Sequence, residues 1–244
     1  MDAMTISVLV PAYNEASGLG ASLTSIRAAM QAFGARGWTS ELIVCDNNST
    51  DDTAAIARAH GARVVFEPVN QISRARNAAA AAATGDWLVF VDADSHPSAA
   101  LFADVADAVA SGPVVAGGST VVMDGGGRLG AAMVGGWNVL SRVTRWAAGS
   151  FIFVEAAAFR AVGGFSEDLY ASEEINLFRR LKRAARRAGR RIVILHRHPL
   201  ATSGRKLELY SVREIAGFML RTVLTGGRTL RRADGCPVWY DGRR

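Results

Sequence analysis

The sequence is poor in cysteine and in long apolar runs, and each shortage excludes a class of protein. Its 244 residues include two cysteines, Cys45 and Cys236, which can form neither a disulfide framework nor a metal-binding cluster. The N-terminus has no basic start followed by a long apolar stretch, so we expect no signal peptide. The longest apolar run near the C-terminus, 215–220, is far too short to span a membrane. We therefore expect a cytoplasmic protein.

Acidic residues are also outnumbered, since 28 lysines and arginines face 22 aspartates and glutamates, which gives a net charge of +6. The arginines are concentrated from Arg179 to Arg191 and again from Arg228 onwards. Such segments are typical of a solvated helix face, and they also suit the phosphates of a nucleotide or of an anionic membrane surface. No aromatic residues alternate with these arginines to stack on bases, so we do not expect nucleic acid as a partner.

Short β-type runs alternate with helical patterns in the first half of the chain. This alternation predicts βαβ units and a parallel sheet. The expected strands are 6–11, 41–46, 63–68 and 87–91, and the expected helices are 19–33, 49–61 and 73–84. A capping box completed by Asp52 is expected to begin the second of these helices.

The second half has a looser pattern, although half of all residues are hydrophobic and a sizeable core is expected throughout. We expect strands at 114–123, 151–154 and 191–196, and helices at 129–146, 173–188 and 206–224. The last helix has an apolar face that could lie on a membrane or pack on the rest of the domain. This face consists of Val212, Ile215, Met219 and Val223.

Polar residues follow three of the predicted strands, at the point where each strand ends. The first strand runs into Glu15, the second ends at Asp46 and the fourth ends at Asp92 and Asp94. A turn would use the same residue types, but the carboxyl ends of parallel strands meet at the edge where α/β folds bind ligands. Two carboxylates one residue apart repel each other unless a cation lies between them. We therefore predict a divalent metal site at Asp92 and Asp94.

Four segments, taken in order, resemble the family 2 glycosyltransferases of the GT-A fold. They read VLVPAYNEASGL, ELIVCDNNSTDDT, SRARNAAAAAATGDWLVFVDADS and VGGFSEDLYASEEINLFRRL. The resemblance extends from Ile6 to Leu181 and thins out after about Arg191. It implies an α/β, Rossmann-like, mostly parallel sheet flanked by helices in a single domain over 1–244. Within it, about 1–112 would bind the nucleotide, about 113–204 would bind the acceptor, and about 205–244 would form a basic helical tail.

The resemblance also implies the residues of the nucleotide site. Asp46 would accept a hydrogen bond from the imide N–H of uracil, which cytosine lacks. Arg76 and Asn77, together with Arg74, would hold that side of the site in place. The pocket for the nucleoside would be lined by Pro11, Ala12, Tyr13 and Glu15.

The pair Asp92 and Asp94 matches the DxD motif of the family. The resemblance implies that Asp94 binds Mg²⁺ or Mn²⁺ on the donor diphosphate, with Asp92 nearer the ribose and the sugar. His196 or His198 could add a third metal ligand, or could be a surface group. Arg205 and Lys206 could close over the diphosphate.

The acidic pair Glu173 and Glu174 stands where the family has its general base. The family usually carries Glu-Asp here, so Glu174 takes the place of the aspartate and Glu173 is the alternative base. A structural interpretation is also open, in which Ser172 caps a helix and the two glutamates complement its dipole. A base at such a helix start would stay ionised.

The predicted function is inverting transfer of a sugar from a nucleotide sugar, UDP-linked in view of Asp46, to an acceptor hydroxyl. The acceptor would be a saccharide, a lipid-linked molecule or a small molecule. A non-catalytic binding protein on the same scaffold and a sugar-nucleotide pyrophosphorylase are the alternatives. The pyrophosphorylase would need a glycine-rich basic loop where this chain has Pro11 to Glu15. Trp137, Trp146 and Phe151 could stack on an acceptor sugar, or could belong to the core.

Overall fold

The computed structural model describes residues 4–124 and 127–203, and in the C-terminal region residues 214, 217, 221, 222, 224, 225, 227–236 and 240. The strands are β1 (Thr5–Ala12), β2 (Thr39–Asp46), β3 (Arg63–Phe66), β4 (Trp87–Val91), β5 (Ser95–His96), β6 (Val114–Asp124), β7 (Phe151–Glu155) and β8 (Arg191–Ser203). The helices are α1 (Leu19–Gly34), α2 (Thr53–Ala59), α3 (Ile72–Ala82), α4 (Ala99–Ala110), α5 (Gly127–Thr144), α6 (Ala156–Ala161) and α7 (Glu173–Arg187), followed by the 3-10 turns η1 (Arg228–Arg231) and η2 (Ala233–Gly235).

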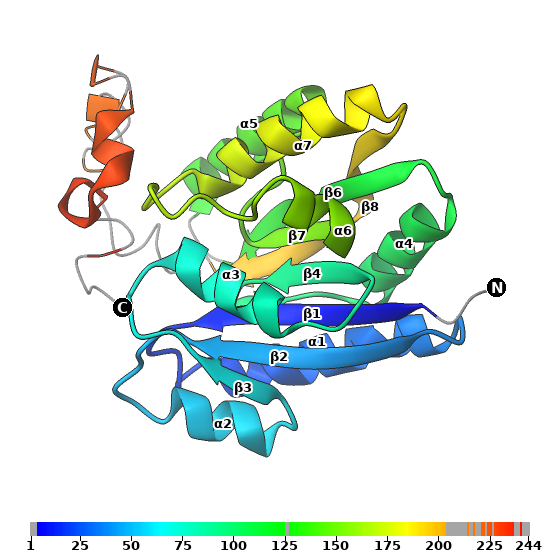
Figure 1. The fold of residues 1–244 in the computed structure, drawn as a ribbon. Coiled ribbons are helices and arrows are strands. Elements are labelled where there is room, and N and C mark those ends of the chain that lie inside the picture. The colour runs from blue at the N-terminus through cyan, green and yellow to red at the C-terminus, as the bar shows by residue number, and fades with distance from the viewer. Residues whose placement is uncertain are drawn as a thin grey trace.

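The described strands form one sheet in the order β3-β2-β1-β4-β7-β6-β8-β5, with helices on both faces (Figure 1). Strands β1 to β4 are parallel to one another, as the alternating pattern predicted. Strand β7 runs antiparallel between β4 and β6, and β6 is parallel to β8. The expected mostly parallel α/β sheet is therefore confirmed, with β7 as an antiparallel insertion.

The direction of β7 brings a loop to the carboxyl edge of the parallel strands. Phe151, the first residue of β7, pairs with Val91, the last residue of β4. The backbone N–H of Asp92 donates to the carbonyl of Ser150 at 3.1 Å. The segment before β7 therefore lies beside the acidic end of β4, where a purely parallel sheet would have placed the end of another strand.

Two apolar clusters cover the two faces of the sheet. On one face, α1 and α4 pack through side chains such as Phe33 and Phe102, whose ring centroids lie 5.2 Å apart. On the other face, the alanines of α3 allow a close approach, and Phe178 of α7 packs with them. Strands β1 and β4 are apolar over nearly their whole length because both of their faces are buried.

Several elements differ from the sequence-based expectation. Helices α4 and α6 and the short strand β5 were not predicted, although Ser98 caps α4 by accepting a hydrogen bond from the N–H of Leu101. The capping box at Asp52 was wrong: Asp51 Oδ1 accepts from the N–H of Thr53 instead. Strand β8 continues to Ser203 because it pairs with β6 and then with β5.

The predicted apolar face of the tail helix (Val212, Ile215, Met219 and Val223) lies outside the described residues. Within the part of the chain that the structure describes, none of the helices combines the length and hydrophobicity needed to cross a bilayer.

Candidate active site

The loops that follow β1 and β2 are locked together by side-chain hydrogen bonds. Asn14, which has a φ of +50°, donates its backbone N–H to Ser49 Oγ at 2.9 Å and accepts from the N–H of Thr50 at 2.8 Å. The N–H of Glu15 donates to Thr53 Oγ1 at 2.9 Å. Tyr13 and Glu15 are half-buried in this loop. Their position is therefore set by neutral hydrogen bonds within the chain.

Asp46 ends β2 at the same edge of the sheet. In the strand register it is level with Ala12 of β1, one residue beyond Pro11. Its carboxylate is buried and accepts the N–H of Ser49 at 3.0 Å. The structure thus brings Pro11, Ala12, Tyr13 and Asp46 together, as the parallel strands required.

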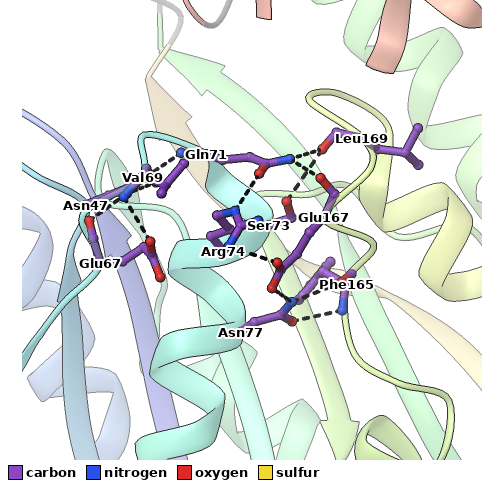
Figure 2. A network of polar contacts seen from close by, with 10 residues as sticks. All are labelled: Asn47, Glu67, Val69, Gln71, Ser73, Arg74, Asn77, Phe165, Glu167 and Leu169. Atoms are coloured by element: carbon purple, nitrogen blue, oxygen red, sulfur yellow. Dashed lines mark hydrogen bonds and ion pairs between the residues drawn. The ribbon is translucent and has the colours of Figure 1, made fainter. Parts of the chain in front are cut away.

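A network of neutral polar contacts joins this edge to the loop before α7 (Figure 2). The Asn47 amide donates to the carbonyls of Glu67 and Val69 at 3.1 and 2.6 Å and accepts the N–H of Gln71 at 3.0 Å. The Gln71 amide in turn donates to the carbonyls of Glu167 and Leu169 at 2.7 and 3.0 Å. The sequence analysis had assigned no role to Gln71, because its partners lie almost a hundred residues away.

Asn77 and Arg74 hold the same loop. Asn77 Nδ2 donates to the carbonyl of Phe165 at 3.0 Å, and its Oδ1 accepts the Phe165 N–H at 2.9 Å (Figure 2). Gly164 has a φ of +64°, and a Cβ there would lie 2.8 Å from Asn77 Oδ1, so the turn requires glycine. Arg74 forms an ion pair with Glu167 at 3.0 Å. In this structure both side chains bind protein groups that position α7.

Arg76 is the buried centre of the site. Its Nη1 donates to Glu173 Oε1 at 2.6 Å, and its Nη2 donates to Asp92 Oδ1 at 2.9 Å and to the carbonyl of Gly149 at 2.7 Å. Only 2% of its side chain is exposed, and its Nε has no hydrogen-bond partner among the residues that the structure describes. Three segments distant in sequence, the end of β4, the loop before β7 and the start of α7, therefore meet at one guanidinium group.

More negative than positive charge surrounds this guanidinium. Burial alone would lower the pKa of Arg76, but the carboxylates of Asp92, Glu173 and Glu174 raise it. Burial, and then the charge of Glu173, raises the pKa of Glu174 to about 8, against the opposing effect of Arg76. The raised pKa of Glu174 runs against the expectation that a carboxyl group at this helix start stays ionised, because one arginine faces three nearby carboxylates.

The start of α7 separates the two glutamates. Glu173 is buried and faces Arg76, whereas Glu174 is half-buried and close to Gly149, where an added Cβ would lie 3.7 Å from its carboxyl carbon. Ser172 has a φ of +61° and makes no side-chain cap. The predicted Ser172 cap was thus wrong, because the left-handed backbone turns the chain sharply into the helix.

The residues at the end of β4 fit a cation that is shared with a ligand. Asp92 gives one carboxylate oxygen to Arg76, and a quarter of its side chain is exposed. Among the described residues, no group of three His, Cys, Asp or Glu side chains could hold a metal ion. A site with two carboxylates, completed by phosphate and water, would suit Mg²⁺, which is commonly held in this way.

His198 and the aromatic candidates for metal or acceptor binding have contacts of their own. Nδ1 of His198 lies 3.0 Å from Asp104 Oδ2 of α4, so its ring is held against that helix. Arg205 and Lys206 lie outside the described residues. Phe151 is fully buried and Trp137 packs on the core, which agrees with the alternative that these aromatic residues belong to the core. Half-buried Trp146 packs on the second apolar cluster.

Described residues of the C-terminal region contact the segment before α7. The N–H of Tyr170 donates to the carbonyl of Leu230 at 2.7 Å, and the Tyr170 ring packs edge-on against Tyr240. Burial, followed by the charge of Glu173, raises the pKa of Cys236 to about 11. The chain therefore returns to the start of α7 near its end, and no motif in the sequence signals this contact.

The sheet order, with helices on both faces, is that of the GT-A fold. A family model described as glycosyl transferase family 2 matches residues 7–155, more than half of the chain. The chain belongs to this family.

Curated relatives resemble a shorter part of the chain. An uncharacterized glycosyltransferase of Mycobacterium bovis is 39% identical over 94 residues, and these cover 38% of either chain. A glucosyl-3-phosphoglycerate synthase of Mycolicibacterium paratuberculosis is 40% identical over 104 residues, which cover 38% of this chain and 30% of the relative. The matched segment thus spans less than half of the length of these relatives.

Solved structures show the same fold at lower identity. A mannosyltransferase of Pyrobaculum calidifontis, in complex with GDP-Man and Mn²⁺, superposes with a TM-score of 0.65 at 21% identity over 91% of this chain and 62% of its own. S. aureus TarS in complex with UDP-GlcNAc gives a TM-score of 0.67 at 19% identity over 98% and 71%. The glucosyl-3-phosphoglycerate synthase of Mycobacterium tuberculosis, with Mn²⁺ and UDP-glucose, gives 0.59 at 24% identity over 91% and 77%.

Proposed function

We propose that the protein transfers a sugar from a UDP-linked donor to an acceptor hydroxyl with inversion at the anomeric carbon. The observation that carries this proposal is the buried Arg76, which joins Asp92 at the donor side to Glu173 beside the candidate base. In this arrangement the carboxylate of Asp92, a group of the kind that binds metal ions, and the separate half-buried carboxyl group of Glu174 lie around the same buried arginine. Family membership and the fold shared with enzymes that bind UDP sugars and Mn²⁺ support the same function.

The nucleoside would bind where the ends of β1 and β2 lie side by side. Asp46 would accept the imide N–H of uracil with its buried carboxylate, whose environment is fixed by the N–H of Ser49. Tyr13 and Glu15, held by the locked loops, would flank the base and the ribose. Arg76 and Asn77 support this side indirectly, because their polar groups bind Asp92, Glu173 and Phe165 in the protein.

Asp94 and Asp92 would hold Mg²⁺ or Mn²⁺ against the donor diphosphate. When bound, the cation would neutralise the charge that develops on the leaving diphosphate. Arg76 fixes one oxygen of Asp92, which limits this side chain to a single orientation toward the donor. The protein contributes few ligands, so the affinity for metal and for nucleotide should be mutually dependent.

Glu174 would take the proton of the acceptor hydroxyl as its oxygen attacks the anomeric carbon. Glu173 is held by Arg76 through a buried ion pair and is the less available of the two. Burial raises the pKa of Glu174 to about 8, so a proton on this group would be favoured near neutral pH. That proton has to leave before the carboxylate can act as a base, so ligand binding and deprotonation should be coupled.

A donor screen tests this proposal. We expect UDP release from at least one member of a panel of nucleotide sugars in the presence of Mn²⁺, and its loss with EDTA or in Asp94→Asn. UDP should bind about ten- to a hundredfold more tightly than CDP, and Asp46→Asn should reduce that preference, because a hydrogen bond to a charged group contributes about 1.5–3 kcal/mol. Metal-independent binding of UDP and CDP with equal affinity would contradict both assignments.

A further inference from the structure

Helix α5 presents an apolar strip to solvent although its own position is fixed. Asn138 bonds the N–H and the carbonyl of Val121 at 3.0 and 2.8 Å, beyond the point where β6 leaves β7, and thereby replaces a neighbouring strand. This contact leaves Val139, Leu140 and Val143 facing outward, with exposed fractions of 63%, 45% and 78%. The strip is therefore a consequence of how the helix is anchored.

Basic side chains surround the C-terminal end of this strip. Lys182 of α7 donates to the carbonyl of Thr144 at the end of α5, and its ammonium lies over the Trp146 ring at 5.4 Å from the centroid. Arg179 and Arg186 lie on α7 at the helical spacing of Lys182 and are exposed. Arg142 and Arg145 are exposed on the α5 side. The two helices lie close together in the fold (Figure 1).

This region carries no compensating negative charge. Neither 127–150 nor 175–191 contains an aspartate or a glutamate. Among the described residues, no carboxylate forms an ion pair with the four exposed arginines named above. Burial, followed by the nearby charges of Arg186 and Arg145, lowers the pKa of Lys182, which shows that these cations repel one another. An anionic partner would relieve that repulsion.

We propose that this α5–α7 face, formed by Val139, Leu140, Val143, Arg142, Arg145, Arg179, Lys182 and Arg186, binds the surface of an anionic phospholipid membrane. An interfacial helix inserts apolar side chains at the level of the headgroups while neighbouring arginines contact the phosphates. Nucleic acid would use the arginines but would leave the valines exposed. A symmetric dimer through this face would bring the same positive charges together.

The face is separate from the candidate active site. Glu173 begins α7 at the site, and Lys182 lies nine residues further along, about 14 Å at 1.5 Å per residue. Membrane binding therefore does not depend on the proposed transfer reaction, and it can be measured without donor or acceptor. A failure of the vesicle experiment leaves the transferase proposal intact, and the reverse also holds.

Vesicle sedimentation with the full chain provides the first test. We expect binding to phosphatidylcholine vesicles in which about one lipid in three is phosphatidylglycerol, and little binding to pure phosphatidylcholine. Salt at about 0.5 M should release most of the protein, because it screens the charges. Arg179→Gln with Arg186→Gln should weaken partitioning about tenfold or more, whereas Arg58→Gln, an exposed arginine of α2, should change it little. Free inorganic phosphate at millimolar concentration should not compete if a lipid surface is required.

A site-specific probe gives the second test. Both native cysteines are buried, so a single cysteine introduced at Val143 can be labelled with an environment-sensitive dye. Its emission should shift to the blue on anionic vesicles, while the same dye at Val69→Cys, an exposed valine in the loop between β3 and α3, should not respond. Val139→Ser with Leu140→Ser should weaken partitioning by about tenfold, since less apolar area is buried.

Three results would overturn the proposal: equal binding to neutral and anionic vesicles, no binding at all, or anionic binding without any response of the Val143 probe. The last would leave an electrostatic contact that does not use the apolar strip. Tight binding of a DNA duplex that blocks vesicle binding, or self-association that the Val139 and Leu140 changes abolish, would assign the face to a different partner.

Discussion

The two sides of the candidate site are held by different kinds of interaction. On the donor side, Asn14, Asn47 and Gln71 fix the strand-end loops through neutral hydrogen bonds to backbone groups. On the acceptor side, Arg76 joins Asp92 to the start of α7 through buried charges. The strand-end loops are thus held largely by neutral groups, whereas three carboxyl groups surround Arg76.

This difference has a consequence for function. Neutral hydrogen bonds within short loops keep a nucleotide pocket in shape whether or not it is filled. Three carboxyls lie around one arginine at the start of α7, and burial raises the pKa of Glu174 to about 8. A cation bound nearby would favour the ionised forms of these carboxyls, so their protonation should depend on what is bound. Changes on the acceptor side should therefore have larger and more pH-dependent effects than changes on the donor side.

The largest effect is expected at Glu174. Glu174→Gln keeps the shape of the side chain but cannot accept the acceptor proton, and a positioned base contributes a factor of about 10² to 10⁴. We expect turnover to fall by about that factor, with donor affinity nearly unchanged, in steady-state and calorimetric measurements. Glu173→Gln serves as the comparison, because its carboxylate is held by Arg76. If Glu173→Gln preserves the folded state and yet reduces turnover more, the assignment of the base is wrong.

The next effect concerns stability and tests the charged centre itself. Arg76→Met leaves Glu173 buried without a partner, and removal of one member of a buried pair costs about 3–5 kcal/mol of unfolding free energy. Urea unfolding monitored by circular dichroism would measure this loss. Arg76→Lys, which keeps the charge but cannot bridge three groups in the same geometry, should be intermediate. Wild-type stability in Arg76→Met would show that the carboxyls there are neutral or solvated.

A smaller effect should appear in the pH dependence of stability of the metal-free protein. The folded-state pKa of Glu174 is raised above its unfolded value, so the folded chain binds more protons between the two values. This contribution to stability is present below the unfolded pKa and is lost as pH rises toward about 8. Glu174→Gln should flatten the decline between pH 5 and pH 8 in urea unfolding with a chelator present. An unchanged pH profile would mean that Glu174 titrates normally.

The donor side could largely be predicted from the sequence and the acceptor side could not. Asp46 and Asp92 follow apolar runs directly, and parallel pairing necessarily brings such strand ends together. The partner of Arg76, by contrast, is 97 residues away, and which of two adjacent glutamates meets it depends on the left-handed backbone of Ser172. Local sequence patterns predict where the strands end, but they do not predict the contact between α3 and α7.

The antiparallel direction of β7 was not predicted, for a related reason. An apolar run such as Phe151 to Val154 is consistent with a buried strand in either direction, because both faces are covered. Its direction depends on where the preceding helix, α5, ends relative to the sheet. Because β7 runs antiparallel, the loop before it brings the carbonyl of Gly149 to Arg76. The strand was predicted, but this contact was not.

The smallest effect is expected at Arg74, two residues before Arg76 on the same helix. Its ion pair with Glu167 joins two side chains that are 38% and 42% exposed, so water and salt screen the attraction. Arg74→Gln should change the unfolding free energy by less than about 1 kcal/mol, and that change should fade in about 0.5 M salt. Urea unfolding of Arg74→Gln beside Arg76→Met compares an exposed and a buried ion pair within one turn of α3. A loss at Arg74 as large as that at Arg76, insensitive to salt, would mean that the loop before α7 depends on its ion pair more than on the amides of Gln71 and Asn77.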